Sequence, residues 1–229
     1  MWNSKKKALT FSYDDGNFQD IRLIDIFNKY GMKATFNLNS GLMNDKGDWV
    51  TTQGMAVRRL RTDNIAEIYK GHEVAVHCAT HPHIIDMPEE ELRREILDDK
   101  AALEKLFDCK INGMAYPYGE VSPEIMRITG ECGIKFSRTC WDLHGFQPQT
   151  DLLMFRATCH HNYEKLWDLV DEFLAYDGDE PIYFCLWGHS YEFDIHENWQ
   201  LIEEFCRKLS DSNDIFYGTN SEVLLEQQL

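Results

Sequence analysis

The amino-acid sequence predicts an α/β fold in which parallel strands alternate with helices. Short apolar runs and amphipathic helical patterns follow one another along the whole chain, which is typical of βαβ units. Seven or eight such units in 229 residues indicate a barrel or near-barrel with about seven parallel strands and surrounding helices. Neither a low-complexity linker nor a sharp change in composition divides the chain, so we expect a single domain over residues 1–229.

The N-terminal half starts with the most regular of these units. Residues 9–15 form an apolar run that ends in two carboxylates and Gly16, which indicates a strand. Residues 18–30 have apolar side chains at three-residue spacing and are followed by Gly31, which indicates a helix and its stop. By the same criteria we expect a strand at 34–39, a glycine-rich loop at 41–56, a short helix at 62–69 and a strand at 73–77.

The C-terminal half continues the alternation. Residues 88–107 begin with Pro-Glu-Glu-Glu, which suits a helix N-terminus because the helix dipole favours acidic residues there. Residues 181–187 are apolar throughout and predict a buried strand. Shorter runs predict strands at 113–118, 134–138, 153–159 and 215–219, helices at 122–130, 163–176 and 199–209, and a short terminal helix.

The chain is strongly acidic, with a formal net charge of −16 and a pI near 4.9. This balance argues against binding to nucleic acid, which requires clustered Lys and Arg, and against binding to an anionic membrane surface. It favours neutral or cationic substrates and attracts divalent cations, although acidity can equally serve solubility alone.

The cysteines and the N-terminus predict the compartment. The chain has seven cysteines and no C-x-x-C pair, which fits reduced thiols. The basic N-terminus leads into a strand rather than into the apolar core of a signal peptide, and no apolar run is long enough to span a bilayer. We therefore expect a cytoplasmic protein without a signal peptide or transmembrane segment, and the oligomeric state stays open.

Residues that can do chemistry gather at the ends of the expected strands. Parallel barrels place their sites at the carboxyl ends of the strands, so these side chains are expected to converge. They are Asp14 and Asp15 after the first strand, His77 and His81 after the third, Tyr118 after the fourth, and His189 after the seventh.

Two histidines and one aspartate make a plausible metal site with open positions for water. His77 and His81 are four residues apart, so both imidazoles can face one side. A metal there would acidify a bound water and polarise a carbonyl, while the other aspartate accepts a proton and His189 protonates a leaving group. We expect zinc, and the same ligands also suit cobalt, nickel, manganese and iron.

Each feature also has a plainer interpretation. Asp-Asp-Gly is commonly a turn, His-x-x-x-His is a weak metal motif, and His189 beside Trp187 could be a core histidine. Their common position at strand ends favours a site.

Four stretches, in order, resemble the motifs of the polysaccharide deacetylase family, the NodB-homology carbohydrate esterases of family 4. Residues 11–16 resemble its Thr-Phe-Asp-Asp-Gly motif, and residues 71–82 resemble its Gly-His-Glu stretch followed by His-Ser/Thr-x-x-His. Residues 117–119 match its Pro-Tyr-Gly, and residues 186–189 resemble its last, Leu-x-x-His-like motif. The resemblance spans nearly the whole chain and implies a distorted (β/α) barrel.

The resemblance also implies roles for the residues. Asp14 resembles the family's catalytic base and His189 its catalytic acid, while Tyr118 resembles the residue whose backbone N–H helps to hold the oxyanion. The residues that resemble its metal ligands are Asp15, His77 and His81. The activity implied is metal-dependent hydrolysis that removes acetyl groups from an N- or O-acetylated carbohydrate. The alternatives are hydrolysis of another non-peptide C–N bond on a small molecule, or an inactive carbohydrate-binding homologue.

The chain departs from the family pattern in three places. Cys78 stands where the family has Ser or Thr, and Ala115 stands near the position of an Arg that orients the base. The family's Asp-x-x-Asp-Trp motif is missing, with residues 136–141 in its place. We expect Arg138 to supply the guanidinium to Asp14, with Arg156 as the second choice and a solvated Arg138 as the alternative.

Other candidates rank lower. Aromatic residues could form a sugar-stacking wall, although aromatics are more often core; they are Trp141, Trp187 and Tyr191. His160 and His161 beside Cys159 suggest a Cys/His nucleophile only weakly, because adjacent residues rarely face each other. His83 and His144 are expected at the rim of the site.

Overall fold

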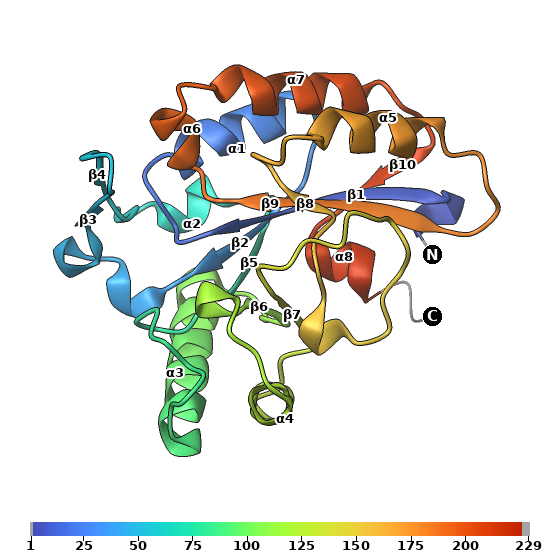
Figure 1. The fold of residues 1–229 in the computed structure, drawn as a ribbon. Helices are drawn as coiled ribbons and strands as arrows, with labels where there is room; N and C mark the ends of the chain where they lie inside the picture. The colour runs from blue at the N-terminus through green and yellow to red at the C-terminus, as the bar shows by residue number, and fades with distance from the viewer. Residues whose placement is uncertain (1, 226–229) are drawn as a thin grey trace.

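A computed structural model describes residues 2–225 (Figure 1). Its main sheet is parallel throughout, in the order β7-β6-β5-β2-β1-β9-β8. The strands are β1 (Lys7–Asp14), β2 (Thr35–Leu38), β5 (Glu73–Val76), β6 (Gly113–Ala115), β7 (Phe136–Arg138), β8 (Cys159–His160) and β9 (Ile182–Gly188). An eighth strand, β10 (Ile215–Tyr217), pairs with the first half of β1.

The central strand β1 positions the site. All eight of its residues are buried, as expected for a strand covered on both faces. It pairs with β9 along its length and with β2 at its end, so that Asp14 lies beside Asn37 and Tyr13 beside Gly188. The acidic pair is therefore delivered to the carboxyl edge in the middle of the sheet.

The sheet curls into a half-barrel, which confirms the predicted distorted barrel. Its edges approach each other through residues 155–160. Phe155 bridges to Arg138 of β7, and three residues later the backbone N–H of Thr158 donates to Cys185 of β9 at 2.8 Å. This short extended segment, which includes the edge strand β8, therefore links the opposite edge strand β7 to β9.

The helices cover the sheet in two groups (Figure 1). Above β1 and β9 lie α1 (Asp20–Lys29), α5 (Leu166–Ala175) and α7 (Trp199–Ser210), and below lie α3 (Glu89–Phe107) and α4 (Pro123–Glu131). The shorter helices are α2 (Ile65–Ile68), α6 (Glu192–Ile195) and α8 (Asn220–Leu224), with 3₁₀ turns at Trp2–Ser4, Ser40–Leu42, Asp45–Gly47, Pro117–Gly119 and Leu152–Met154. No helix within residues 2–225 is long and apolar enough to cross a membrane.

Local signals explain where several helices begin and end. α4 starts with Ser122, whose hydroxyl accepts the N–H of Ile125 at 3.2 Å, and with Pro123 in the first turn. α3 has three glutamates in its first turn and ends at Asp108 in a left-handed conformation with φ 47°.

Three expectations about elements need correction. The fourth strand ends at Ala115, and Tyr118 lies in the 3₁₀ turn that follows, because Pro117 has no N–H for the ladder. The sixth strand is the two-residue β8 rather than residues 153–159, where a 3₁₀ turn forms first. The expected loop at 41–56 contains an antiparallel hairpin of β3 (Trp49–Val50) and β4 (Ala56–Val57), and α6 was missed because it is a single turn.

Candidate active site

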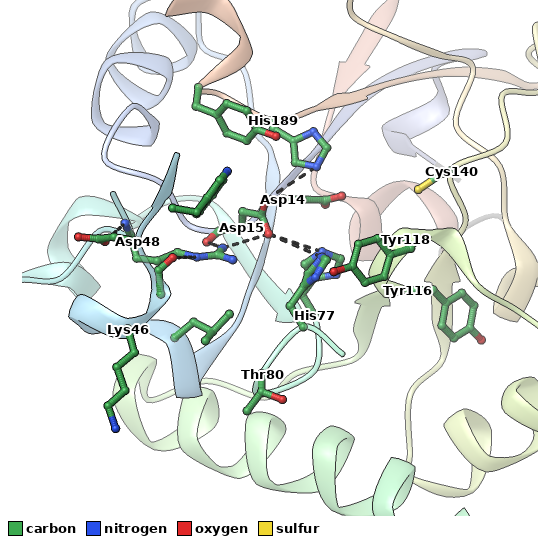
Figure 2. Close-up of a pocket in the computed structure, with 16 residues that line it drawn as sticks. Asp14, Asp15, Lys46, Asp48, His77, Thr80, Tyr116, Tyr118, Cys140 and His189 are labelled. Carbon is green, nitrogen blue, oxygen red and sulfur yellow. Dashed lines mark hydrogen bonds and ion pairs between the residues drawn. The ribbon is translucent and has the colours of Figure 1, made fainter. Parts of the chain in front are cut away.

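A pocket of about 540 Å³ opens at the carboxyl edge of the sheet (Figure 2). Both aspartates of the β1 end line it, together with His77 and His81 after β5 and His189 after β9. Tyr118 also lines it, from the turn after β6. The six residues singled out at strand ends therefore meet in one cavity, although up to 175 positions separate them along the chain.

Asp15, His77 and His81 form a cluster suited to a divalent cation. The Oδ1 atom of Asp15 lies 3.9 Å from Nε2 of His77 and 3.9 Å from Nε2 of His81. These three candidate ligand atoms all lie within 4.8 Å of one another. Two imidazoles and a carboxylate are a donor set that zinc and similar ions accept, with positions left for water.

The protonation of His77 fits this use. Its Nδ1 lies 2.7 Å from the backbone oxygen of Ala115, which can only accept, so Nδ1 carries the proton. The lone pair of Nε2 is then directed toward Asp15, as in histidines that bind metals through one nitrogen and donate through the other. Burial lowers the pKa of His77, which favours the neutral, ligating form even though both aspartates oppose the shift.

Arg59 is a close neighbour of this cluster that the sequence did not reveal. Its Nη1 lies 3.0 Å from Oδ1 of Asp15 and also donates to the backbone oxygen of Asp15 and to Oδ1 of Asn39. Burial alone would raise the pKa of Asp15, but Arg59 and the nearby histidines hold it well below its usual value. Asp15 is therefore a carboxylate that Arg59 neutralises in part.

Asp14 faces a different set of partners. Nη2 of Arg138 donates to its Oδ2, and Nδ2 of Asn37 donates to its Oδ1 at 2.8 Å. Arg138 is only 1% exposed, so the interpretation of this residue as a solvated surface arginine is wrong. Burial would raise the pKa of Asp14, but Arg138 outweighs this and lowers it, so that the side chain is a carboxylate at neutral pH.

Arg138 is itself held on several sides. Its Nε donates to Oγ of Ser12 at 2.9 Å, its Nη1 donates to the backbone oxygen of Thr139 at 3.0 Å, and its guanidinium lies 4.3 Å from the ring centre of Trp187. Arg156, the second choice, lines a separate surface hollow and is not among the partners of Asp14.

His189 follows directly after Gly188, the last residue of β9. Its Nε2 lies 3.9 Å from Oδ2 of Asp15, as the dashed line in Figure 2 marks. Burial alone would lower its pKa, but Glu192 and the two aspartates raise it to about 9. This shift favours the imidazolium form of His189 at neutral pH, in the lining of the pocket.

Tyr118 has an unusual backbone for a non-glycine residue, with φ 55°. Its side chain is 54% exposed and lies edge-on to His81, with ring centres 4.6 Å apart. On the other side it stacks on His83, with ring centres 4.0 Å apart, and His83 is not among the residues that line the pocket. His144 stacks on Tyr163 and does not line the pocket either.

The lower-ranking candidates do not assemble as expected. Of the three aromatic residues proposed as a wall, only Tyr191 lines the pocket; Trp187 is buried beneath Arg138, and Trp141 lines the hollow with Arg156. Burial raises the pKa of the Cys159 thiol, which keeps it protonated and argues against a Cys/His nucleophile.

Comparisons with known proteins agree with this fold. The curled parallel sheet and the pocket at its carboxyl edge place this chain among the α/β half-barrel proteins. Within that class, the polysaccharide deacetylase family model matches residues 2–137, more than half of the chain. The chain belongs to the polysaccharide deacetylase family.

Solved structures with this fold share little sequence with the chain. The Xyl-CE4 domain of a multidomain xylanase from the hindgut metagenome of Trinervitermes trinervoides is 17% identical, with a TM-score of 0.64 over 99% of this chain and 93% of that one. A family 4 acetyl xylan esterase from Clostridium thermocellum, in complex with a cobalt ion, is 18% identical, with a TM-score of 0.65 over 97% and 92%. A CE4 family pseudoenzyme from Bacillus anthracis is 16% identical, with a TM-score of 0.59 over 96% and 66%.

Proposed function

We propose that residues 1–229 form a single catalytic domain that removes acetyl groups from an N- or O-acetylated carbohydrate with the help of a divalent metal, zinc first among the candidates. The observation that carries the proposal is the joint presence, in one pocket, of a metal-type cluster, a separate buried carboxylate and the imidazole of His189. Family membership and the cobalt complex of the acetyl xylan esterase support the same chemistry.

The metal ligands are proposed to be Asp15, His77 and His81. A divalent cation bound there would polarise the acetyl carbonyl and lower the pKa of an attacking water. The cluster supports this role because His77 is held in the ligating tautomer by Ala115 and because Asp15 presents an oxygen toward both imidazoles.

Three other residues of the pocket are proposed to transfer protons or to stabilise the negative charge that develops on the substrate. Asp14 accepts the proton of the attacking water, because Arg138 and Asn37 keep it ionised and oriented. The backbone N–H of Tyr118 donates to the oxygen of the tetrahedral intermediate, and the positive φ of this residue supports a turn specialised for that purpose. His189 gives its proton to the departing amine or alcohol.

The experiment measures acetate release by the full chain from acetylated xylan and from N-acetylated chitooligosaccharides. Turnover should disappear when a chelator removes the metal and return with zinc or cobalt. Asp14→Asn and His189→Ala should each lower turnover by about 100-fold or more while the fold survives. Asp25→Asn, an exposed acidic residue on α1, is the matched control and should leave turnover unchanged.

Two outcomes would overturn the proposal. Saturable carbohydrate binding without turnover in the metal-loaded protein would make the chain an inactive carbohydrate-binding homologue. Turnover of small linear or cyclic amides, with none of acetylated sugars, would assign it to another C–N bond.

A further inference from the structure

Beside the pocket, three histidines surround one carboxylate oxygen. Oε2 of Glu192 lies 3.1 Å from Nε2 of His160, 3.3 Å from Nε2 of His161 and 3.4 Å from Nδ1 of His189. The same oxygen accepts the backbone N–H of His189 at 3.1 Å. None of the expected roles accounts for Glu192 or for the His160–His161 pair.

His160, His161 and Glu192 are close enough to suggest a second metal site. The hydrogen bond on the far side of His160 argues against one. The backbone N–H of Asn162 donates to Nδ1 of His160 at 3.1 Å, so Nδ1 is an acceptor and the proton of the neutral ring is on Nε2. A protonated Nε2 donates to Glu192 and offers no lone pair to a metal, in contrast to His77 at the first cluster.

Glu192 is ionised and therefore accepts hydrogen bonds only. Burial would raise its pKa, but the contacts with His160 and His189 lower it strongly. The nitrogens that face a carboxylate must carry protons to interact favourably with it. Within residues 2–225, Nδ1 of His189 is buried with no aligned hydrogen-bond partner, and Oε2 of Glu192 is the acceptor that faces it.

The surroundings keep this carboxylate in place. His161 is fully buried, stacks on Phe193 at 4.2 Å and lies beside the Tyr13 hydroxyl at 3.3 Å. Glu192 itself begins α6, the single turn that follows the β9 end. The packed pair of His161 and Phe193 thus fixes α6, and with it Glu192, against the strand that delivers His189.

We propose that Glu192, supported by His160 and His161, is a positioning residue that accepts the Nδ1–H of His189 and thereby turns Nε2 of His189 toward the reacting atoms. The inference rests on the proposed function, because it assigns the support of the proposed acid. It also predicts that the nitrogen which exchanges its proton with substrate is Nε2 alone.

The first test needs no turnover. Full-length protein with ¹⁵N-labelled histidine should show a ring N–H signal from Nδ1 of His189 that exchanges slowly with water, assigned by its loss in His189→Gln. Glu192→Ala should abolish this protection, and Glu197→Gln should leave it unchanged, since Glu197 is an exposed acidic residue just beyond α6. Absence of the signal in the wild type, or its persistence in Glu192→Ala, would overturn the assignment.

The second test separates positioning from substrate binding. Glu192→Ala should lower kcat by about 100-fold with KM changed by less than about twofold, because a misplaced acid affects the transition state rather than the bound substrate. Glu192→Gln keeps an acceptor oxygen and should recover most of kcat. If both variants fold and turn over like the wild type, Glu192 does not position His189. If the wild type deacetylates nothing, the proposed function fails while the ring N–H measurement still decides the contact.

Discussion

Asp14 and Asp15 are adjacent in the chain, but their side chains contact different residues. Because neighbouring residues at a strand end point to different sides, Asp14 faces Arg138 and Asn37, whereas Asp15 faces Arg59 and the two histidines. The charge of a different arginine therefore stabilises the ionised form of each carboxylate. This separation allows one side chain to handle a proton and its neighbour to hold a cation.

Removal of Arg138 should affect both stability and turnover. Arg138→Ala leaves Asp14 as an uncompensated buried charge, so we expect a loss of about 3–5 kcal/mol in the free energy of unfolding. Turnover should fall by about 100-fold because Asp14, the proposed base, is no longer oriented. Urea unfolding and acetate release measure the two effects.

Arg156→Ala is the matched control, because its side chain lines the separate hollow beside Trp141. This variant should change neither the free energy of unfolding nor turnover appreciably. Unchanged turnover in a folded Arg138→Ala protein would show that Asp14 needs no guanidinium.

Arg59 and a metal ion bound at Asp15 should each neutralise part of the charge of this carboxylate, so one should partly compensate for loss of the other. In the metal-free protein, Arg59→Ala removes the cation nearest to Oδ1 of Asp15 and should cost about 3–5 kcal/mol of stability. A cation at the proposed metal site would neutralise the same oxygen, so zinc should stabilise the variant more than the wild type. Urea unfolding of both proteins, with chelator and with zinc, measures this difference. Equal stabilisation of the two by zinc would contradict it.

At the scale of elements, the loops after the strands are tied to helices through buried polar contacts. Asp20, the first residue of α1, accepts the hydroxyl of Ser190 after β9 and the hydroxyl of Tyr69 after α2. Burial raises the pKa of Asp20 to about 7, although both hydroxyl contacts lower it. The start of α1 thus fixes the residue directly after His189.

This buried carboxyl makes the stability of the fold depend on pH. The folded pKa of about 7 lies above the ordinary value of 3.8, so between these values the folded protein binds a proton that the unfolded chain lacks. The stabilisation that the protonated Asp20 carboxyl gives to the folded state is fully present below pH 4 and is lost as the pH rises through 7. Asp20→Asn should remove this pH dependence. In the wild type, the loss should amount to a few kcal/mol in the free energy of unfolding, at about 1.4 kcal/mol per pKa unit.

The measurement is urea unfolding at pH 5 and pH 8. The variant should gain stability relative to the wild type at pH 8. Asp25→Asn, an exposed aspartate on the same helix, should follow the wild type at both pH values. A wild type and an Asp20→Asn protein with the same pH dependence would show that Asp20 titrates normally.

At the scale of the whole molecule, the two ends of the described chain pack against each other. The indole N–H of Trp2 donates to the backbone oxygen of Val223 in α8 at 3.0 Å, and Nζ of Lys5 donates to Ile215 in β10 at 2.9 Å. Glu73 of β5 accepts hydrogen bonds from Ser221 at the start of α8. α8 therefore connects the N-terminus to the middle of the sheet.

Truncation should reveal this connection. A chain that ends at Gly218 lacks α8, exposes Trp2 and leaves the partly buried Glu73 without the hydrogen bonds from Ser221. We expect a marked fall in the urea midpoint, because an apolar contact and hydrogen bonds to a partly buried carboxylate are lost. The full chain, which retains α8, is the comparison, and equal midpoints for the two proteins would show that α8 contributes little.

Much of the fold followed from local patterns. The order of strands and helices, the buried central strand and the helix starts at 88 and 122 follow from apolar runs, prolines and capping residues, which act over a few positions. The errors fell where local patterns are weak: the single turn α6, the two-residue strands β3, β4 and β8, and the turn that carries Tyr118. Short elements such as these are stabilised by tertiary contacts rather than by their own sequence.

The sequence by itself determined which residues reach the carboxyl edge of the sheet, because a strand end and its following loop are local features. The tertiary structure decided which partners those residues meet. Arg138 and Asp14 are 124 positions apart, and they meet because the sheet curls and residues 155–160 link β7 to β9. Arg59 reaches Asp15 from an irregular loop, and Glu192 reaches His189 from a turn too short to predict. Pairings of this kind depend on how strands and loops pack, and packing is a property of the whole chain.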